Sequence, residues 1–354
     1  MTESSTPPAP STRWGILATG KIAHQFAQDL LQTPGAQLVA VGSRRLAAAE
    51  EFAAAYSREG EPVRAHGSYE DLVADPEVDV VYIATPHSLH LENARLAFEA
   101  GKHVLCEKPL TLNLADAEEM VALARRHDRF LMEAMWMACH PGIRALRERL
   151  HAGEFGRPAH IHAELGFVVT ADPSDRMLDP ALGASALLDM GIYPLTFAHL
   201  MLGEAAALTA QADLATAGES TFDRAIALTG KYADGGLATM VASITSWSSS
   251  AATIATDRGR IDLQEFHHPT TITFTPRAVV ADWTAQGGTV EPVEIVPVEP
   301  VIGRGYGNEA LEVGRCLAAG LRESPLVPHE QTLALLRQMD DVRRQVGVHL
   351  PADG

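Results

Sequence analysis

The chain has few cysteines, few cations and no long apolar run. The three cysteines, Cys106, Cys139 and Cys316, follow no spacing pattern, which argues against a disulfide framework and fits a reducing cytoplasm. No segment is apolar for long enough to span a bilayer, and the Ser/Thr/Pro-rich start lacks the apolar run of a signal peptide. We therefore expect a cytoplasmic protein that does not enter membranes.

Basic residues are outnumbered by acidic ones, 28 to 45, which gives a formal net charge of −17. Such a surface disfavours the phosphate backbone of nucleic acids and anionic membranes, so we expect neither as a partner. One small anionic cofactor in a local basic pocket remains compatible with this charge. The 354 residues suffice for two domains, and 46% hydrophobic residues allow each a core.

Short apolar runs alternate with amphipathic stretches from Arg13 to Trp136, which predicts a doubly wound parallel sheet. The expected elements are strand 14–17, helix 21–32, strand 37–41, helix 46–56, a short helix from 68, strand 78–83, helix 88–100, strand 103–106, helix 114–127 and strand 130–134.

Strands separated by tight turns replace this alternation after Trp136. Turn signals such as Asp234-Gly235-Gly236 join them without helices between, which predicts an antiparallel sheet. The expected elements are helices 142–151, 182–202, 308–319 and 331–346, and strands 158–169, 208–215, 225–232, 237–245, 252–256, 260–263 and 270–274. The fold class is thus α/β, with a disordered tail (1–12), a Rossmann domain (13–136) and a second α/β domain (137–354) built on a large open antiparallel sheet.

The first predicted strand leads into a loop that partly matches the dinucleotide-binding fingerprint. Small residues at Ala18, Gly20 and Ala23 occupy its three positions. Alanine at the first is a departure, tolerable only if that residue does not need a positive φ. A side chain at Gly20 would displace phosphates from the helix N-terminus. We expect five residues here to contact the cofactor: Ala18, Thr19, Gly20, Lys21 and Ile22.

The end of the second predicted strand indicates which dinucleotide binds. The sequence there is Gly42-Ser43-Arg44-Arg45, with no carboxylate before Glu50 to hold ribose hydroxyls. A serine hydroxyl and a guanidinium suit a phosphate, so Ser43 and Arg44 favour NADP. The alternative is that both arginines are solvated charges at a helix start.

The stretch 100–110 is central to the prediction. The predicted strand 103–106 cannot continue past Pro109, which leaves Glu107 and Lys108 at the carboxyl end of a parallel strand, where open α/β sheets bind ligands. The alternative is a surface turn with a solvated Glu–Lys pair. His90, in the first turn of the preceding helix, lines the nicotinamide pocket or is an ordinary helix-start histidine.

Several motifs together resemble the glucose–fructose oxidoreductase / inositol dehydrogenase / MocA family over nearly all of 13–348. They are Ile83-Ala84-Thr85-Pro86-His87-Ser88-Leu89-His90, Glu107-Lys108-Pro109, Met132-Glu133-Ala134-Met135-Trp136, Asp179-Pro180-Ala181-Leu182-Gly183 and Ala186-Leu187-Leu188-Asp189-Met190-Gly191-Ile192-Tyr193-Pro194. The last three are most similar to the branch that contains dihydrodiol dehydrogenase, xylose dehydrogenases and sugar reductases.

The resemblance implies where the cofactor and substrate bind. Thr85, Pro86, His90, Glu107 and Lys108 would contact the cofactor, with Lys108 beside the nicotinamide. The substrate would meet Lys108, Trp136, Asp189 and Tyr193. The open sheet of the second domain often forms a subunit interface in this family, so a homodimer or higher homo-oligomer is expected.

This chain also departs from the pattern of that branch. Ala184 and Ser185 stand where a glycine pair is common, and Ala138 and Cys139 stand where an arginine and an aromatic are common. Family members often have asparagine at His87. These differences bear on the substrate more than on the chemistry.

Carbonyl reduction needs a hydride, a proton and stabilisation of the developing alkoxide. NADPH would supply the hydride. The Lys108 ammonium could donate the proton or stabilise the developing alkoxide. Tyr193 would relay a proton, and Asp189, four residues earlier and so on the same helix face, would accept from a substrate hydroxyl or hold Lys108. Structural alternatives are a helix-face carboxylate for Asp189 and a buried aromatic for Tyr193. Glu107 is expected to pair locally.

The leading function is an NADP-dependent oxidoreductase that interconverts a secondary alcohol and a carbonyl of a sugar, sugar derivative or vicinal diol. Two alternatives share the fold: a non-catalytic dinucleotide-sensing regulator and a glycosidase that uses its cofactor transiently. No metal is expected, because no cysteine or carboxylate falls at matching spacing near His160, His162 or the pair His267-His268.

Overall fold

The structure is a computed structural model that describes residues 11–172, 175–277 and 291–353. The chain divides into two compact units. The first comprises residues up to Thr111, Ala115–Trp136 and Val301–His329, and the second comprises Leu112–Leu114, Met137–Pro300 and Glu330–Gly354. The segment 301–329, assigned to the second domain from the sequence, thus belongs to the first unit.

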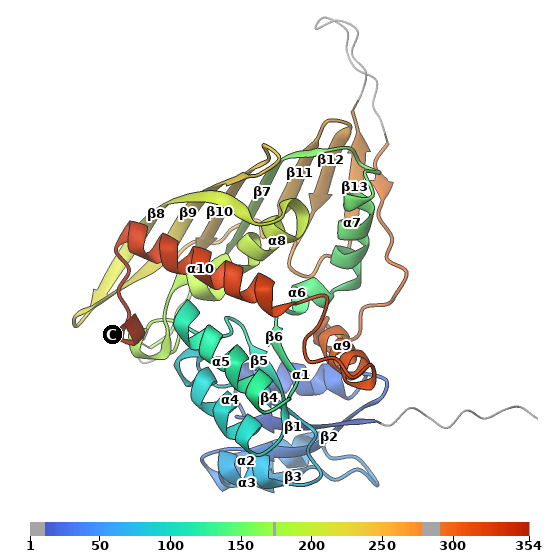
Figure 1. Ribbon diagram of the computed structural model, residues 1–354, viewed down its shortest axis with the longest axis vertical. Helices are drawn as coiled ribbons and strands as arrows, with labels where there is room; N and C mark the ends of the chain where they lie inside the picture. The colour runs from blue at the N-terminus through green and yellow to red at the C-terminus, as the bar shows by residue number, and fades with distance from the viewer. Residues whose placement is uncertain (1–10, 173–174, 278–290, 354) are drawn as a thin grey trace, which may run out of the picture. The chain divides into compact units, whose positions relative to one another are not determined.

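A six-stranded parallel sheet in the order β3-β2-β1-β4-β5-β6 forms the first unit (Figure 1). This is the doubly wound order of dinucleotide-binding folds, so the predicted parallel sheet is confirmed. The strands are β1 (Thr12–Leu17), β2 (Ala36–Gly42), β3 (Arg64–His66), β4 (Val80–Ile83), β5 (His103–Glu107) and β6 (Leu131–Ala134). β1 begins inside the predicted tail, whose residues 1–10 lie outside the described residues.

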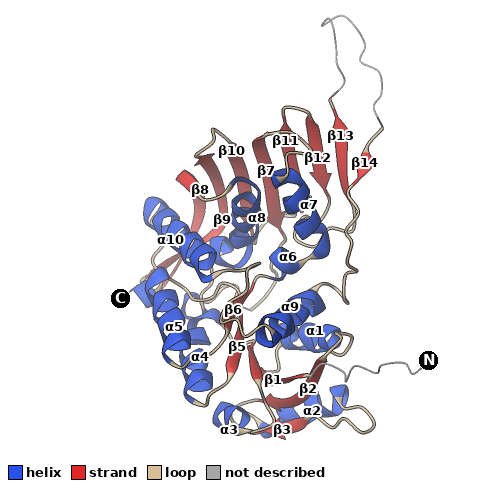
Figure 2. Cartoon of the chain, turned by 45° about the vertical axis from the view of Figure 1, so that its right-hand side comes forward, coloured by secondary structure: helices blue, strands red, loops and turns tan. Residues whose placement is uncertain are grey.

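Helices cover both faces of this sheet. They are α1 (Lys21–Leu30), α2 (Leu46–Tyr56), α3 (Tyr69–Ala74), the short η1 (His87–Leu89), α4 (His90–Glu99), α5 (Leu114–Arg126) and α9 (Tyr306–Ala318). In Figure 2, α4 and α5 lie on one side of the sheet and α1 and α9 on the other. The core between sheet and helices is aromatic, with the rings of Phe26 and Tyr82 stacked at 3.8 Å between centroids.

A buried carboxylate joins α9 to α1. Asp29, near the end of α1, is 2% exposed and accepts hydrogen bonds from the backbone N–H groups of Arg304 (2.7 Å) and Tyr306 (3.0 Å). It therefore satisfies donors at the start of α9, where a negative charge is also favourable. Gly303 has a φ of +62°, and a β-carbon there would lie 2.1 Å from Asp29 Oδ1, so the close approach requires glycine.

The second unit is built on an eight-stranded sheet in the order β14-β13-β12-β11-β7-β10-β9-β8. Its pairs are antiparallel except β7 and β10, which run parallel. The predicted antiparallel sheet is therefore confirmed, with one parallel pair within it. The strands are β7 (Pro158–Gly166), β8 (Ala205–Ala217), β9 (Ser220–Tyr232), β10 (Leu237–Ser243), β11 (Ala252–Thr256), β12 (Gly259–Leu263), β13 (Ile272–Pro276) and β14 (Val293–Glu294).

One face of this sheet carries the helices of the second unit (Figure 2). They are α6 (Trp136–Cys139, which begins in the first unit), α7 (Pro141–His151), η2 (Pro180–Leu182), η3 (Leu187–Gly191), α8 (Ile192–Leu202), α10 (His329–Val346, also begun in the first unit) and η4 (Pro351–Asp353).

The predicted helical segment 182–202 is mostly helical, but it is divided into three pieces. Gly183 takes a left-handed φ of 93° and ends η2, and η3 is a π-helical turn that leads into α8. The segment Pro180–Leu202 also contradicts the prediction that no run is long and apolar enough to span a bilayer, with a mean hydropathy of 1.3 in its most apolar window. Because 89% of that window is buried in the protein, the segment has the character of a core helix.

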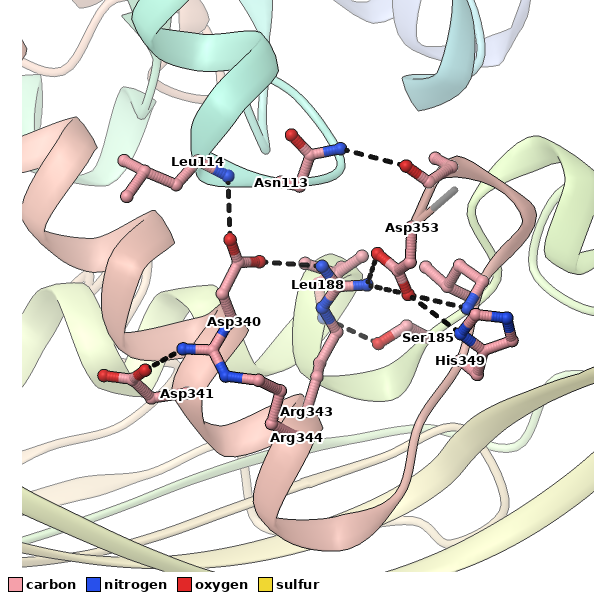
Figure 3. Close-up of polar contacts among 12 residues, drawn as sticks. Asn113, Leu114, Ser185, Leu188, Asp340, Asp341, Arg343, Arg344, His349 and Asp353 are labelled. Atoms are coloured by element: carbon pink, nitrogen blue, oxygen red, sulfur yellow. Dashed lines mark hydrogen bonds and ion pairs between the residues drawn. The ribbon is translucent and has the colours of Figure 1, made fainter.

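A cluster of charges closes the C-terminal end of the second unit. The guanidinium of Arg343, in α10, contacts Asp340 at 2.7 Å and Asp353 at 2.9 Å, and its side chain is only 5% exposed (Figure 3). Asp340 also accepts a hydrogen bond from the backbone N–H of Leu114 at 2.9 Å. Burial of these charges is tolerable because each has a partner of opposite sign or a hydrogen-bond donor.

Candidate functional site

The N-terminus of α1 has the features of an anion site. Gly20 precedes the helix with an extended backbone, no side chain caps the helix, and its first turn contains no acidic residue. A β-carbon at Gly20 would meet no described protein atom within 4 Å. The free N–H groups and the space beside Gly20 therefore fit the diphosphate of a dinucleotide. Thr19, Lys21 and Ile22 beside it are half-buried or exposed.

Ala18 has a φ of +88°. From the sequence we expected alanine to be tolerable here only if the residue does not need a positive φ, and the structure shows that it adopts one. Its backbone N–H donates to the carbonyl of Gly42 at 3.0 Å, which ties the loop to the end of β2. An L-residue in this region costs about 1–2 kcal/mol relative to its preferred conformations. The first position of the fingerprint is strained in this chain.

Ser43 and Arg44 follow β2 directly. Ser43 is buried and its hydroxyl oxygen accepts from the N–H of Arg45 at 3.4 Å, while Arg44 is exposed. Half-buried Tyr69, at the start of α3, lies beside Arg44: burial raises the pKa of the Tyr69 hydroxyl, and the guanidinium opposes this rise. Sequence reasoning missed Tyr69, because nothing in its local pattern indicates that it faces Arg44.

The loop after β4 is joined to the turn after β5 by His90. This side chain is fully buried, with Nε2 3.0 Å from the carbonyl oxygen of Thr85 and Nδ1 3.1 Å from that of Pro109. Asn93 also donates to the Thr85 hydroxyl at 3.0 Å. His90 thus links the loop that contains Thr85 to the turn that follows Lys108.

Glu107 and Lys108 lie at the carboxyl end of β5, as the sequence indicated. Glu107 is 8% exposed, accepts a hydrogen bond from the hydroxyl of Tyr82 on one oxygen, and accepts from the N–H of Lys108 at 3.2 Å on the other. Glu107 therefore makes the local contacts expected of it. Lys108 is half-buried.

A second buried carboxyl, Glu309 of α9, lies in the same unit and is 0% exposed. Burial, followed by the charges of Glu107 and Asp29, raises the pKa of Glu309 well above its ordinary value. Neither of its carboxyl oxygens has a hydrogen-bond partner among the described residues. The enclosed position of Glu309 therefore disfavours its ionised form, and no sequence pattern pointed to this residue.

Trp136 packs its ring against Tyr306. Their centroids lie 4.5 Å apart with the planes 22° from parallel, and Trp136 is 5% exposed. The stacked pair belongs to the first unit and fixes the Trp136 ring next to the start of α9.

Asp189 and Tyr193 belong to the second unit. Asp189 lies in the π-helical turn η3, and Tyr193 lies in the first turn of α8, so one helical segment carries both, although it is not a single α-helix. π-Turns inside helices are rare and frequent at functional sites. Arg176, which sequence reasoning missed, donates from Nη1 to Asp189 Oδ1 at 3.1 Å. The ring of His267 packs on that of Tyr193 at 5.4 Å between centroids.

Ser185 and Asp223 fix the start of this segment. Asp223, on β9, is 0% exposed and accepts from the Ser185 hydroxyl and from the N–H of Leu187, each at 2.6 Å. The Ser185 hydroxyl oxygen in turn accepts from the N–H of Leu188 at 3.1 Å. Ser185 therefore caps the start of the helical segment.

The structure thus assembles two groups of predicted residues. The first unit holds the cofactor loops and Lys108 at the carboxyl edge of its parallel sheet, and the second unit holds Asp189 and Tyr193. His160 and His162 contact the Thr239 hydroxyl at 3.4 and 3.0 Å. Among the described residues, no three His, Cys, Asp or Glu side chains are grouped as metal ligands.

Comparison with known proteins identifies the family. The model described as oxidoreductase family, NAD-binding Rossmann fold, matches residues 12–135, and that of the GFO/IDH/MocA C-terminal domain matches residues 143–262. Trans-1,2-dihydrobenzene-1,2-diol dehydrogenase of Danio rerio is 36% identical over 338 residues, covering 95% of this chain and 97% of that protein. D-xylose 1-dehydrogenase (NADP(+)) of Hypocrea jecorina is 35% identical over 367 residues, covering 96% and 93%.

Solved structures agree on the fold. The aldose-aldose oxidoreductase of Caulobacter crescentus, complexed with glycerol, matches with a TM-score of 0.82 at 21% identity and covers 95% of this chain and 98% of its own. A 3-ketoreductase of Actinomadura kijaniata in complex with NADP matches with a TM-score of 0.75 at 23% identity over 95% and 98%. With both halves matched by family models, the chain belongs to the GFO/IDH/MocA oxidoreductase family.

Proposed function

We propose that this oxidoreductase transfers a hydride between NADP(H) and a secondary alcohol or carbonyl of a sugar, sugar derivative or vicinal diol. Similar proteins are named for a dihydrodiol and for D-xylose, which supports this range of substrates. The observation that carries the proposal is the position of Lys108 directly after β5. The strands of a parallel sheet end at one edge, so this amine lies at the same edge as the open N-terminus of α1.

The residues present fit NADP. The N-terminus of α1 would hold the diphosphate, and Ser43 and Arg44 would hold the phosphate on the adenosine ribose, where NAD-binding chains place a carboxylate. Tyr69 beside Arg44 would form part of the same pocket. NADPH supplies the hydride when bound.

The reaction of the carbonyl then depends on three side chains. Lys108 donates a hydrogen bond to the substrate oxygen and stabilises the negative charge that develops on it. Tyr193 delivers or accepts the proton, and Asp189 accepts a hydrogen bond from a substrate hydroxyl. Trp136, stacked on Tyr306, would pack against the carbon skeleton of the substrate.

We also propose that the protein forms a homodimer through the outer face of its eight-stranded sheet, inside the reducing cytoplasm that its three free cysteines fit. This face carries small uncharged side chains on β8, β9 and β10, including Thr209, Ala227, Thr229 and Val241, around a hollow of about 310 Å³. Small uncharged side chains on a sheet face allow a second sheet to pack closely against it. Sedimentation at micromolar concentration should give a dimer, and a monomer would contradict this assembly.

NADPH oxidation against a panel of ketoses, osones and diketones tests the function, together with NADP⁺ reduction by D-xylose and by vicinal diols. We expect turnover with at least one carbohydrate or diol pair and a clear preference for NADP(H). NADPH binding without turnover on the whole panel would favour the regulatory alternative. Release of a sugar from a glycoside without net NADPH consumption would favour the glycosidase.

A further inference from the structure

Asp189 is a buried carboxylate with an arginine directed at it from another part of the chain. The Arg176 guanidinium donates to Asp189 Oδ1 at 3.1 Å, and the two side chains are 44% and 6% exposed. A carboxylate removed from water to this extent is costly unless a cation and hydrogen bonds compensate it. The two side chains therefore differ in burial: the Asp189 carboxylate is enclosed, and the Arg176 guanidinium contacts it from a more exposed position.

The backbone on both sides of Arg176 is held in a tight turn. One carboxylate oxygen of Asp175 accepts from the N–H of Met177 at 2.9 Å, and the carbonyl of Asp175 accepts from the N–H groups of Leu178 (2.8 Å) and Asp179 (2.9 Å). Such an Asx-type turn restricts the direction in which the next side chain leaves the backbone. The hydrogen-bonded turn at Asp175 thus directs the Arg176 side chain toward Asp189.

Asp189 is fixed from its own side as well. Its N–H donates to the carbonyl of Ser185 at 3.0 Å, and Asp223 holds the residues that start the segment. Tyr193 follows four residues later, in the first turn of α8, which continues directly from η3.

We propose that Arg176 is a positioning residue that keeps the Asp189 carboxylate charged and oriented for a substrate hydroxyl. This inference rests on the proposed function, in which Asp189 accepts that hydrogen bond. A charge-assisted pair with fixed geometry gives the acceptor one orientation before the substrate arrives. Arg176 acts through Asp189 and takes no part in hydride or proton transfer.

Arg176→Ala and Arg176→Lys test this role, with Arg149→Gln as the matched control. Arg149, in α7, also pairs with a carboxylate, but its partner Glu154 is 47% exposed, whereas Asp189 is 6% exposed. We expect Arg176→Ala to lower kcat/KM for the sugar or diol by roughly 10- to 100-fold, with NADPH affinity and the thermal midpoint nearly unchanged. Arg176→Lys should retain part of the activity, and Arg149→Gln should match the wild type.

Added guanidinium separates positioning from a purely structural role. At tens of millimolar, guanidinium chloride should restore the activity of Arg176→Ala by tenfold or more, whereas sodium chloride at equal concentration should not. A variant within twofold of the wild type, or one that loses activity in step with its thermal midpoint and is not rescued, overturns the inference. A wild type that turns over no member of the panel overturns the proposed function and this inference with it.

Discussion

Ser185 and Asp223 are joined by a 2.6 Å hydrogen bond that lies entirely inside the second unit and sets the start of the segment carrying Asp189 and Tyr193. Burial raises the pKa of Asp223, and the bonds from Ser185 and Leu187 oppose that rise. The contact depends on the hydroxyl of Ser185.

Asp223→Ala should therefore be strongly destabilising. It leaves the Ser185 hydroxyl and the Leu187 N–H buried without this acceptor, and each such loss costs about 1–3 kcal/mol. Asp223→Asn keeps the shape and one acceptor and should cost less. Urea unfolding measures both, with Ser249→Ala, which removes an exposed hydroxyl bonded to Glu164, as control. Equal stabilities of Asp223→Ala and the control would contradict this account.

Glu309→Gln should make the protein less sensitive to pH. The raised pKa means that the folded protein keeps the Glu309 proton at pH values where the unfolded chain releases it. The free energy of unfolding therefore falls as pH rises above the ordinary carboxyl range, by about 1.4 kcal/mol per pH unit, until the folded pKa is reached. Glutamine, a neutral isostere, removes this contribution.

Urea unfolding of the wild type and Glu309→Gln between pH 5 and pH 8 measures the difference. The variant should gain stability relative to the wild type as pH rises. Exposed Glu70, in α3, provides the control Glu70→Gln, whose profile should follow the wild type. Parallel profiles for Glu309→Gln and the wild type would rule out a buried proton at this position.

Ala18→Gly should stabilise the protein. Glycine accepts a φ of +88° without steric cost, so the strain at the end of β1 is relieved, and a gain of about 1 kcal/mol is expected after its own entropy cost. Thermal unfolding without cofactor measures this gain. Ala23→Gly, inside α1, is the counterpart and should destabilise the protein. A lower midpoint for Ala18→Gly would mean that the loop is not strained.

Arg44→Ala should change the choice of cofactor. Loss of a charge-assisted contact with the ribose phosphate costs about 1.5–3 kcal/mol, so KM for NADPH should rise by one to two orders of magnitude while KM for NADH stays nearly constant. Arg126→Ala, which removes an exposed cation at the end of α5, should leave both constants unchanged. Equal use of NADPH and NADH by the wild type would contradict the assignment of Arg44 to the ribose phosphate.

Lys108→Ala should lower kcat by about 10²–10⁴-fold while NADPH still binds, and Tyr193→Phe should do nearly as much with the fold intact. The two side chains act on one proton transfer, so the double variant should lose less than the product of the single losses. Steady-state kinetics and NADPH fluorescence titration measure both quantities. Near-normal turnover by Lys108→Ala would place the chemistry elsewhere.

The sequence predicted the parallel sheet well because its signals are local. Runs such as Val80–Ile83 alternate with amphipathic helices, and Pro109 marks the end of β5 without reference to distant residues. The loop at Gly20 contains few glycines, but it could be predicted as the dinucleotide-binding loop because a strand precedes it and a helix follows it.

What the sequence did not reveal depends on contacts between distant residues. The parallel pairing of β7 with β10 joins strands about 80 residues apart, and local turn signals gave only antiparallel neighbours. Asp223, on β9, accepts a hydrogen bond from Leu187 at the start of the π-turn that contains Asp189, and the two residues are 36 positions apart in the sequence. Arg176 has no motif around it, and its importance is visible only through its contact with Asp189.

The return of α9 to the first unit has a consequence for biosynthesis. Asp29 is made early, yet the N–H groups that satisfy it belong to Arg304 and Tyr306. During synthesis on the ribosome, the first unit therefore lacks α9, and Asp29 lacks these donors, until nearly the whole polypeptide has emerged. A truncation after residue 300 would leave it permanently in that state.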